Sequence, residues 1–246
     1  SHTHSGAERV SSPICKFTVR DGCEIVIYPS PGVPIGVIRQ FLLGNVMAIL
    51  LHQRRVFVLH ASAVEIDGHT VAIAGESGAG KSSLAAVLVS RGHGFLTDDV
   101  LPISADSELP QVSPGYPQIR ISPEVASLLG LNPKELLFLH PVEKKRGWRV
   151  IQYFVRSPRK LKCVYVLTED RCLDQQVNAL HPAEAVLEVV RHSHPTRFLQ
   201  PSGGAHFQQS SWLAKSVPFF RLKRSDNLSG LTELARTVEK HIVNFA

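Results

Sequence analysis

The sequence predicts an α/β fold, and three features support that prediction. Strand-like and helix-like segments are interspersed along the 246 residues, as they are when helices pack on a sheet. A glycine-rich stretch, residues 75–83, stands between a strand-like and a helix-like segment. A chain of this length, 43% hydrophobic, can bury a core without disulfides or structural metals. We therefore expect one α/β body with a small N-terminal lobe.

The composition limits the partners. A formal charge of +6, spread along the chain, favours an anionic partner such as a nucleotide phosphate or an acidic peptide. Aromatic and basic residues are not interleaved as in nucleic-acid binders, so no nucleic-acid partner is expected. The four cysteines form no CxxC pair and indicate reduced thiols of a cytoplasmic protein. The longest apolar run, residues 41–51, is far below the ~20 residues that span a bilayer, which favours a soluble protein without a membrane partner.

The small lobe is predicted over residues 13–55. Residues 17–28 alternate in polarity on either side of Asp21-Gly22, a pattern that indicates a hairpin. Three prolines then interrupt the chain. Apolar residues recur at helical spacing over residues 35–52, which indicates a helix or a broken pair of helices packed on the body.

The body is predicted over residues 56–246. Residues 56–66 and 70–74 are strand-like and flank the turn signal Asp67-Gly68, so we expect an antiparallel hairpin. A helix, a short strand and two acids should follow it. Beyond the hairpin the patterns predict helices at 82–91, 123–131, 182–192 and 228–245, strands at 95–97, 150–155, 162–167 and 219–222, and a loop at 113–117.

The stretch GESGAGKSS, residues 75–83, matches the P-loop pattern G-x-x-x-x-G-K-[ST]. Backbone N–H groups of such a loop point inward and bind anions, and the following helix adds the positive end of its dipole. Lys81 should reach the β- and γ-phosphates, and Ser82 should bind Mg²⁺. The alternative is a glycine-rich turn that binds nothing, but the long pattern lies between a strand and a helix, as phosphate binding requires. We predict that a nucleoside triphosphate is bound by Gly75, Ser77, Gly78, Ala79, Gly80, Lys81, Ser82 and Ser83.

Two further features are candidates for chemistry. Asp98 and Asp99 end a short apolar strand, and adjacent residues of an extended chain point in opposite directions, so one acid can hold a metal while the other faces an acceptor. A solvated turn is the ordinary alternative for such a pair. His60, in the strand-like VFVLHASAV, is either a hydrogen-bonded core residue or a neighbour of the phosphates or of Asp98.

The segment LHASAVEIDGHTVAIAGESGAGKSSLAAVLVSRGHGFLTDDV, residues 59–100, resembles the catalytic core of HPr kinase/phosphorylase. The shared elements are a Leu-His strand, a hairpin, the P-loop, a helix ending in Arg-Gly-His and a strand ending in Asp-Asp. The resemblance implies a P-loop kinase domain of the kind that forms the C-terminal domain of HPr kinase, with ATP and Mg²⁺ as cofactors. It also implies that Asp98 is the catalytic base, that Asp99 is associated with Mg²⁺ together with Ser82, and that His60 neighbours the catalytic acid.

The wider chain resembles a branch of that family, the kinases encoded with lasso-peptide biosynthesis. The segments FLLGNVMAILLHQRRVFVLHASAV, SPGYPQIRI and KKRGWRV are similar to those enzymes, which phosphorylate the C-terminal serine of a precursor peptide. We find no counterpart of the glycine-arginine-asparagine segment where the bifunctional HPr enzymes control phosphorolysis. The resemblance therefore does not carry over phosphorylase activity or HPr as the substrate.

A basic cluster offers a further candidate site. Lys145, Arg146 and Arg149, with Lys144 beside them, are either a solvated face or a clamp for a transferred phosphate or a peptide carboxylate. Taken together, the patterns favour an ATP-dependent serine kinase with a lasso-peptide precursor as its partner. The alternatives are a kinase of a carrier protein or of free serine, and a nucleotide-sensing module that transfers nothing. The sequence leaves the oligomeric state open, a homo-oligomer included.

Overall fold

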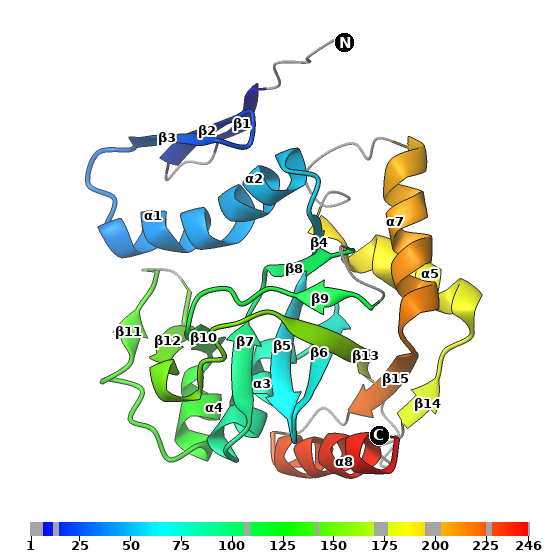
Figure 1. The fold of residues 1–246 in the computed structure, drawn as a ribbon. Coiled ribbons are helices and arrows are strands. Elements are labelled where there is room, and N and C mark those ends of the chain that lie inside the picture. Colours follow the sequence, from blue (N-terminus) through cyan, green and yellow to red (C-terminus); the bar gives the residue numbers. More distant parts are fainter. Residues whose placement is uncertain are drawn as a thin grey trace.

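The structure is a computed structural model, and it describes residues 7–11, 15–105, 109–140, 143–169, 177–194, 203–224 and 228–245. A small three-stranded sheet lies at the N-terminal end of the molecule, a helical segment lies beneath it, and a mixed α/β body forms the rest (Figure 1). The predicted α/β class is therefore confirmed.

The N-terminal sheet contains the predicted hairpin. Strands β1 (Ala7–Ser11), β2 (Cys15–Arg20) and β3 (Glu24–Pro29) pair antiparallel in that order. The β2–β3 turn has Asp21 at φ 49° and Gly22 at φ 65°, both in the left-handed region that tight hairpin turns require. The hairpin predicted around Asp21-Gly22 is confirmed.

The helical segment that follows is bent at a π-helical turn. It comprises α1 (Ile35–Phe41), the π-turn η1 (Leu42–Val46) and α2 (Met47–Gln53), and Gly44 departs from helical geometry at φ −95° and ψ −107°. The 19 residues are apolar enough, by length and composition, to cross a membrane, a test that core helices also pass. Here Ile38, Val46 and Ile49 pack against β2 in a cluster of their own. The cytoplasmic location stays a prediction.

The body is built on a nine-stranded mixed sheet. The strands follow the order β4-β8-β9-β13-β6-β5-β7, with β15 beside β13 and β14 beside β15. β13 pairs parallel with both β6 and β15, so these three strands end at the same edge of the sheet. The strands are β4 (Phe57–Leu59), β5 (Ala61–Ile66), β6 (His69–Gly75), β7 (Gly94–Thr97), β8 (Leu101–Ser104), β9 (Gln111–Val112), β13 (Arg159–Glu169), β14 (Val177–Ala179) and β15 (Phe219–Arg224).

The predicted hairpin before the P-loop is confirmed. β5 and β6 pair antiparallel from Ile66 opposite His69 to Ala61 opposite Ala74, around a turn with Asp67 at φ 48° and Gly68 at φ 80°. The predicted strand 56–66 is divided, because β4 pairs with β8 whereas β5 pairs with β6 and β7. His60 lies at this division.

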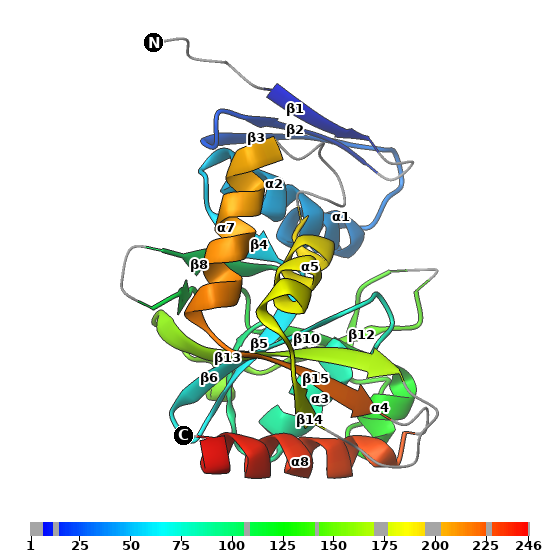
Figure 2. The same ribbon diagram turned by 90° about the vertical axis from the view of Figure 1, so that its right-hand side faces the viewer.

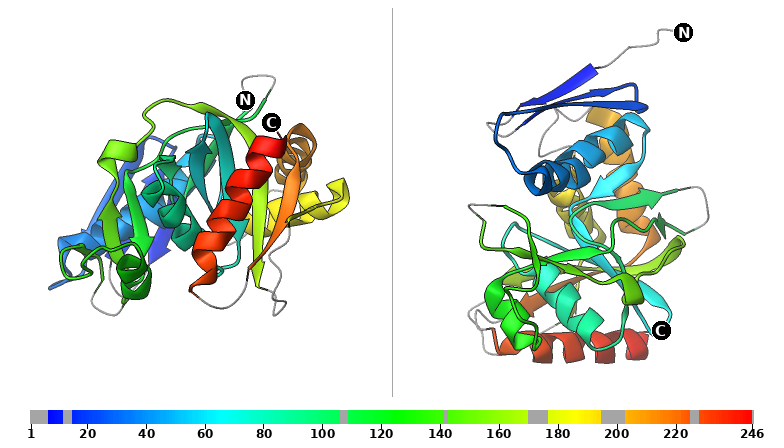
Figure 3. Two further views of the ribbon diagram at one scale, coloured as in Figure 1. Left: turned by 90° about the horizontal axis from the view of Figure 1, so that it is seen from below. Right: turned by 90° about the vertical axis from the view of Figure 1, so that its left-hand side faces the viewer.

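Helices cover both faces of the sheet. Along β6, Val71 and Ile73 pack in one hydrophobic cluster while Ala72 and Ala74 pack in another, as the two-residue period of a strand requires. The first cluster includes residues of α3 (Lys81–Ser90) and α8 (Gly230–Phe245), which lies across the sheet in Figure 3. The second includes residues of α5 (Pro182–His192) and α7 (Gly203–Ser216), both in front of the sheet in Figure 2.

A smaller sheet flanks the body. Strands β10 (Gln118–Ile121), β12 (Arg146–Arg149) and β11 (Leu137–Phe138) pair antiparallel, and α4 (Pro123–Leu128) follows β10. The strand predicted at 150–155 is wrong, because residues 151–153 form the 3₁₀ turn η2 (Ile151–Tyr153). The apolar side chains there do not share a buried face, since Ile151 is exposed while Val150 is buried.

Candidate active site

The P-loop has the backbone that its glycines predict. Residues 75–80 connect β6 to α3, and Gly75, Gly78 and Gly80 all have positive φ, at 149°, 91° and 100°. The ammonium of Lys81 turns back into the loop and donates to the carbonyl oxygens of Gly75 and Glu76, at 3.0 Å each. Lys81 is buried, so its charge faces the inside of the loop. This arrangement fits a phosphate chain held by backbone N–H groups and one ammonium.

Asp98 connects this loop to the neighbouring strands. Its Oδ1 accepts hydrogen bonds from the hydroxyls of Ser62 and Ser82, at 2.7 and 2.8 Å, and its Oδ2 accepts one from the backbone N–H of Arg120 at 3.2 Å. Ser82, in the first turn of α3, is the residue predicted to bind Mg²⁺. Asp98 rather than Asp99 therefore contacts the predicted metal-binding serine.

Asp99 is held by different partners. Its Oδ1 lies 2.8 Å from Nδ1 of His60, its Oδ2 lies 2.9 Å from Nη2 of Arg120, and its backbone oxygen lies 3.0 Å from Nε2 of His194. Burial alone would raise the pKa of Asp99, but the hydrogen bond from His60 and the charge of Arg120 outweigh it and hold the pKa well below its usual range. Asp99 is therefore a carboxylate at neutral pH.

Mg²⁺ binds oxygen ligands, and the residues around Ser82 fit it. The Ser82 hydroxyl and the Asp98 carboxylate present two hard oxygen atoms 2.8 Å apart. At Asp99, by contrast, the guanidinium of Arg120 opposes a second cation. Within the described residues no group of three or more His, Cys, Asp or Glu side chains is placed to hold a metal. The roles predicted for the two acids stay predictions, and these contacts favour Asp98 as the acid on the metal side.

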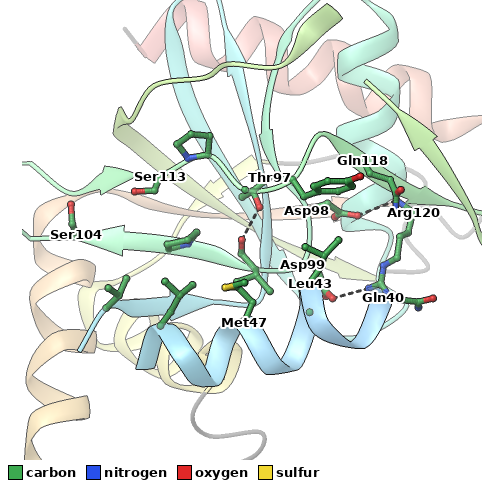
Figure 4. A pocket seen from close by; sticks show the side chains of 18 residues that line it. Gln40, Leu43, Met47, Thr97, Asp98, Asp99, Ser104, Ser113, Gln118 and Arg120 are labelled. Atoms are coloured by element: carbon green, nitrogen blue, oxygen red, sulfur yellow. Dashed lines mark hydrogen bonds and ion pairs between the residues drawn. The ribbon is translucent and has the colours of Figure 1, made fainter. Parts of the chain in front are cut away.

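A pocket of about 450 Å³ opens beside the two acids and is mostly apolar. In Figure 4 its one wall is the bent helix, with Gln40, Leu43 and Met47, and its other wall carries Asp98, Asp99, Gln118 and Arg120. The π-turn places Gly44 against the acids, since a Cβ atom there would lie 3.5 Å from Oδ2 of Asp99. The remaining lining residues are Leu51, Val56, Thr97, Val100, Pro102, Ser104, Ser113, Pro114, Gly115 and Tyr116.

The structure brings together most of the residues predicted for the site. The P-loop residues, both acids and His60 form one continuous region. The predicted clamp does not join it, because Lys145, Arg146 and Arg149 are not among the described residues that line the pocket. Arg146 instead lies over the Phe138 ring at 5.2 Å, and Lys145 and Arg149 are exposed.

Two site residues were missed by the sequence analysis. The first is His194, whose contact with Asp99 depends on a fold that brings together residues 95 positions apart. Arg120 had a readable signal, because QIRI in β10 alternates polar and apolar residues and so places Gln118 and Arg120 on one face. That face is the one that meets the acids.

Comparison with known proteins adds the family context. Residues 53–119 match the HPr Serine kinase C-terminal domain. The HPr kinase-like stretch contains His60, the P-loop and both acids, and it ends one residue before Arg120. Together with the topology, this match confirms the predicted fold class, a P-loop α/β domain of the HPr kinase C-terminal kind with a small N-terminal lobe. The boundary predicted between residues 55 and 56 stays a prediction.

Individual relatives are similar over the same part of the chain. The HPr kinase/phosphorylase of Aromatoleum aromaticum is 35% identical over 98 residues, which cover 40% of this chain and 30% of that protein. That of Chlorobium luteolum is 37% identical over 86 residues, covering 33% and 26%. The match thus spans less than a third of the length of these relatives. The solved Hpr(Ser) kinase/phosphatase from Coxiella burnetii is 16% identical, with a TM-score of 0.42 over 76% of this chain and 97% of that chain.

Proposed function

We propose that this protein is an ATP- and Mg²⁺-dependent kinase that phosphorylates a serine hydroxyl of a peptide. The observation that carries the proposal is the hydrogen bond from Ser82 to Asp98, because it joins the P-loop to the acidic end of the pocket. A phosphate chain on the loop and a hydroxyl in the pocket would meet at Asp98. The similarity to HPr kinase/phosphorylases over residues 53–119 supports this class of reaction.

The chain's own residues position the reactants. Lys81 and the loop N–H groups hold the phosphates in line with the pocket, and Ser82 and Asp98 provide the oxygen atoms for the metal. Mg²⁺, when bound, neutralises charge on the phosphate oxygens. Asp98 Oδ1 accepts hydrogen bonds from two serine hydroxyls in this structure, and we assign it the same contact with the acceptor serine. Asp98 takes the hydroxyl proton as the serine oxygen bonds to the γ-phosphorus of ATP, and ADP leaves.

Asp99 acts through its neighbours in this proposal. Both of its carboxylate oxygens are engaged, one by His60 and one by Arg120, and the latter lines the pocket. Asp99 and His60 are therefore positioning residues that fix the guanidinium of Arg120 at the acidic end. This division moves the metal contact from Asp99, where the sequence predicts it, to Asp98.

The finer proposal is that the acceptor is the C-terminal serine of a lasso-peptide precursor. The pocket has room for a few residues, and its apolar lining suits apolar side chains beside the serine. Arg120 is the one positively charged side chain among the described residues that line it. A terminal carboxylate next to the hydroxyl would bind this guanidinium through hydrogen bonds of fixed geometry.

The test uses peptides that differ only at the terminus. A precursor ending in serine, its Ser→Ala variant and its C-terminal amide are incubated with ATP and Mg²⁺, and phosphorylation is followed by mass spectrometry. The precursor with a free C-terminal carboxylate should be phosphorylated at its last residue, and the Ser→Ala variant should not be phosphorylated. The amide should react more slowly, and the difference should shrink in Arg120→Gln but persist in Arg149→Gln, an exposed arginine outside the pocket.

The rival functions give different results in the same assay. A kinase of a carrier protein, the function that the names of the relatives favour, would leave the peptides unmodified and phosphorylate a folded protein. A kinase of free serine would release phosphoserine. A nucleotide-sensing module would bind ATP and transfer phosphate to none of these acceptors.

A further inference from the structure

The edge of the sheet at which the P-loop begins also carries the end of β15. Gly75 lies opposite Leu167 of β13, and Leu167 lies opposite Leu222 of β15, so the three residues form one row across parallel strands. Arg224 follows two residues beyond Leu222. Ligands of α/β sheets bind at the carboxyl ends of parallel strands, where loops from neighbouring strands meet.

The P-loop contacts β13 at its first residue and β15 at its last. A Cβ atom on Gly75 would lie 2.7 Å from the carbonyl oxygen of Leu167, so the loop begins in close contact with β13. At the other end of the loop, a Cβ atom on Gly80 would lie 2.9 Å from Nη1 and 3.5 Å from Cζ of Arg224. The guanidinium of Arg224 therefore lies directly against the backbone of Gly80.

Several positive charges lie close together around Gly80. Gly80 is the N-cap of α3, where the helix dipole is positive, and Lys81 follows it. The first turn of α3 contains no acidic residue, although Asp98 reaches it through Ser82. An anion bound at this helix end would be attracted by the helix dipole, by the Lys81 ammonium and by the Arg224 guanidinium.

We propose that Arg224 binds the phosphate chain of the nucleotide, from the side of the loop opposite β6. The proposal rests on the nucleotide site proposed above and adds a residue outside the stretch matched to the HPr kinase domain. A guanidinium binds phosphate oxygens through two parallel N–H donors, and a lysine at the same place keeps the charge but only part of that contact. Its Nε is shielded from solvent, and this strengthens the attraction to phosphate.

The experiment measures nucleotide binding rather than transfer, by calorimetric titration of the full chain with ATP and with ADP in the presence of Mg²⁺. Arg224→Gln should weaken both affinities by about 10- to 100-fold, as expected for the loss of a hydrogen-bonded charge. Arg221→Gln is the matched control, because Arg221 is on the same strand and its partner, Glu184, is a distant and exposed one at 3.8 Å. It should bind both nucleotides normally.

A conservative variant separates a phosphate contact from simple packing against Gly80. Arg224→Lys keeps a charge that reaches phosphate but loses the flat group on the glycine, so it should regain part of the affinity. Wild-type affinity in Arg224→Gln would overturn the proposal, and so would an Arg224→Lys variant as weak as Arg224→Gln. Lys81→Ala is the benchmark. If Lys81→Ala also binds ATP normally, the proposed nucleotide site itself is wrong. If only Lys81→Ala loses nucleotide affinity, the site is supported and only the contact with Arg224 is excluded.

A second measurement needs no variant and so does not depend on folding of a mutant. The wild-type protein is treated with phenylglyoxal, which modifies arginine side chains, and the modified residues are mapped by mass spectrometry. ATP and ADP should protect Arg224 while adenosine should not, because only the phosphates reach it. Equal modification of Arg224 with and without ATP would contradict the contact.

Discussion

Replacing Asp98 and Asp99 one at a time by asparagine should produce two different defects. Asparagine suits both positions, since it keeps the size of the side chain and leaves an oxygen to accept hydrogen bonds. It also tolerates the backbone of Asp99, whose φ of 77° is in the left-handed region that most residues avoid. The two variants therefore differ in charge and partners rather than in backbone strain.

The contacts set the expected magnitudes. Asp98→Asn can still accept from Ser62 and Ser82 through its one oxygen, but its amide nitrogen cannot accept the 3.2 Å hydrogen bond from the backbone N–H of Arg120, and it cannot take a proton. Transfer should therefore fall by about 10²–10⁴-fold with only a small loss of stability. Asp99→Asn leaves Arg120 without its counter-charge. The two side chains are 19% and 25% exposed, so we expect a loss of about 1–3 kcal/mol, below the 3–5 kcal/mol of a fully buried pair.

The assay combines thermal unfolding with single-turnover transfer across a Mg²⁺ titration. Asp98→Asn should unfold near the wild-type temperature and require more Mg²⁺, because it loses the charge beside Ser82. Asp99→Asn should unfold at a lower temperature with an unchanged Mg²⁺ requirement. If instead Asp99→Asn raises the Mg²⁺ requirement and unfolds normally, the division of roles predicted from the sequence is correct and ours is wrong. Normal transfer in both variants would remove the acids from the mechanism.

Three further results are expected. Lys81→Ala should lower transfer by about 10²–10³-fold, since it removes a charge aimed at the phosphates, while Lys160→Ala, at an exposed position of β13, should not. Normal turnover in Lys81→Ala would refute the P-loop assignment. Met47→Trp should fill the pocket and raise KM for the acceptor without changing ATP affinity, whereas Leu187→Trp, at an exposed site, should change neither; an unaltered KM would place the acceptor elsewhere. Burial lowers the pKa of His206, so as pH falls the unfolded chain takes up a proton at this histidine before the folded chain does. The free energy of unfolding should therefore decrease as pH falls through about 6.5. Denaturant titrations should show a smaller decrease in His206→Gln, and an equal decrease would show that His206 is not the group responsible.

Local signals account for the elements that the sequence predicted well. The β5–β6 hairpin follows from Asp67-Gly68, which supplies both positive φ angles of the turn. Helix α5 has the predicted bounds, because Pro182 occupies its first turn and its apolar residues recur on one face. The P-loop is equally local, since one continuous stretch supplies its glycines, its lysine and its serine.

Pairing between distant segments decided the rest. The break between β4 and β5 has no local signal, since the apolar run continues through it and only the different partner strands divide it. Helix α7 was not predicted, and its sequence, with Gly203 and Gly204 at the start, has no regular apolar stripe. Arg224 reaches the loop only because β15 lies parallel to β13, an order that no stretch of sequence specifies.

The pocket is lined by a part of the chain that matches the HPr kinase domain and by a part that lies outside that match. Its acidic wall lies almost wholly within residues 53–119, whereas the wall that includes Gln40, Leu43 and Met47 precedes them. The π-turn lets the second wall approach the acids through Gly44, without a side chain that the chemistry would have to accommodate. Substitutions on the bent helix can thus alter the shape of the pocket while the P-loop and Asp98 keep their contacts. A chimaera that exchanges only residues 35–53 would be a practical route to new acceptors.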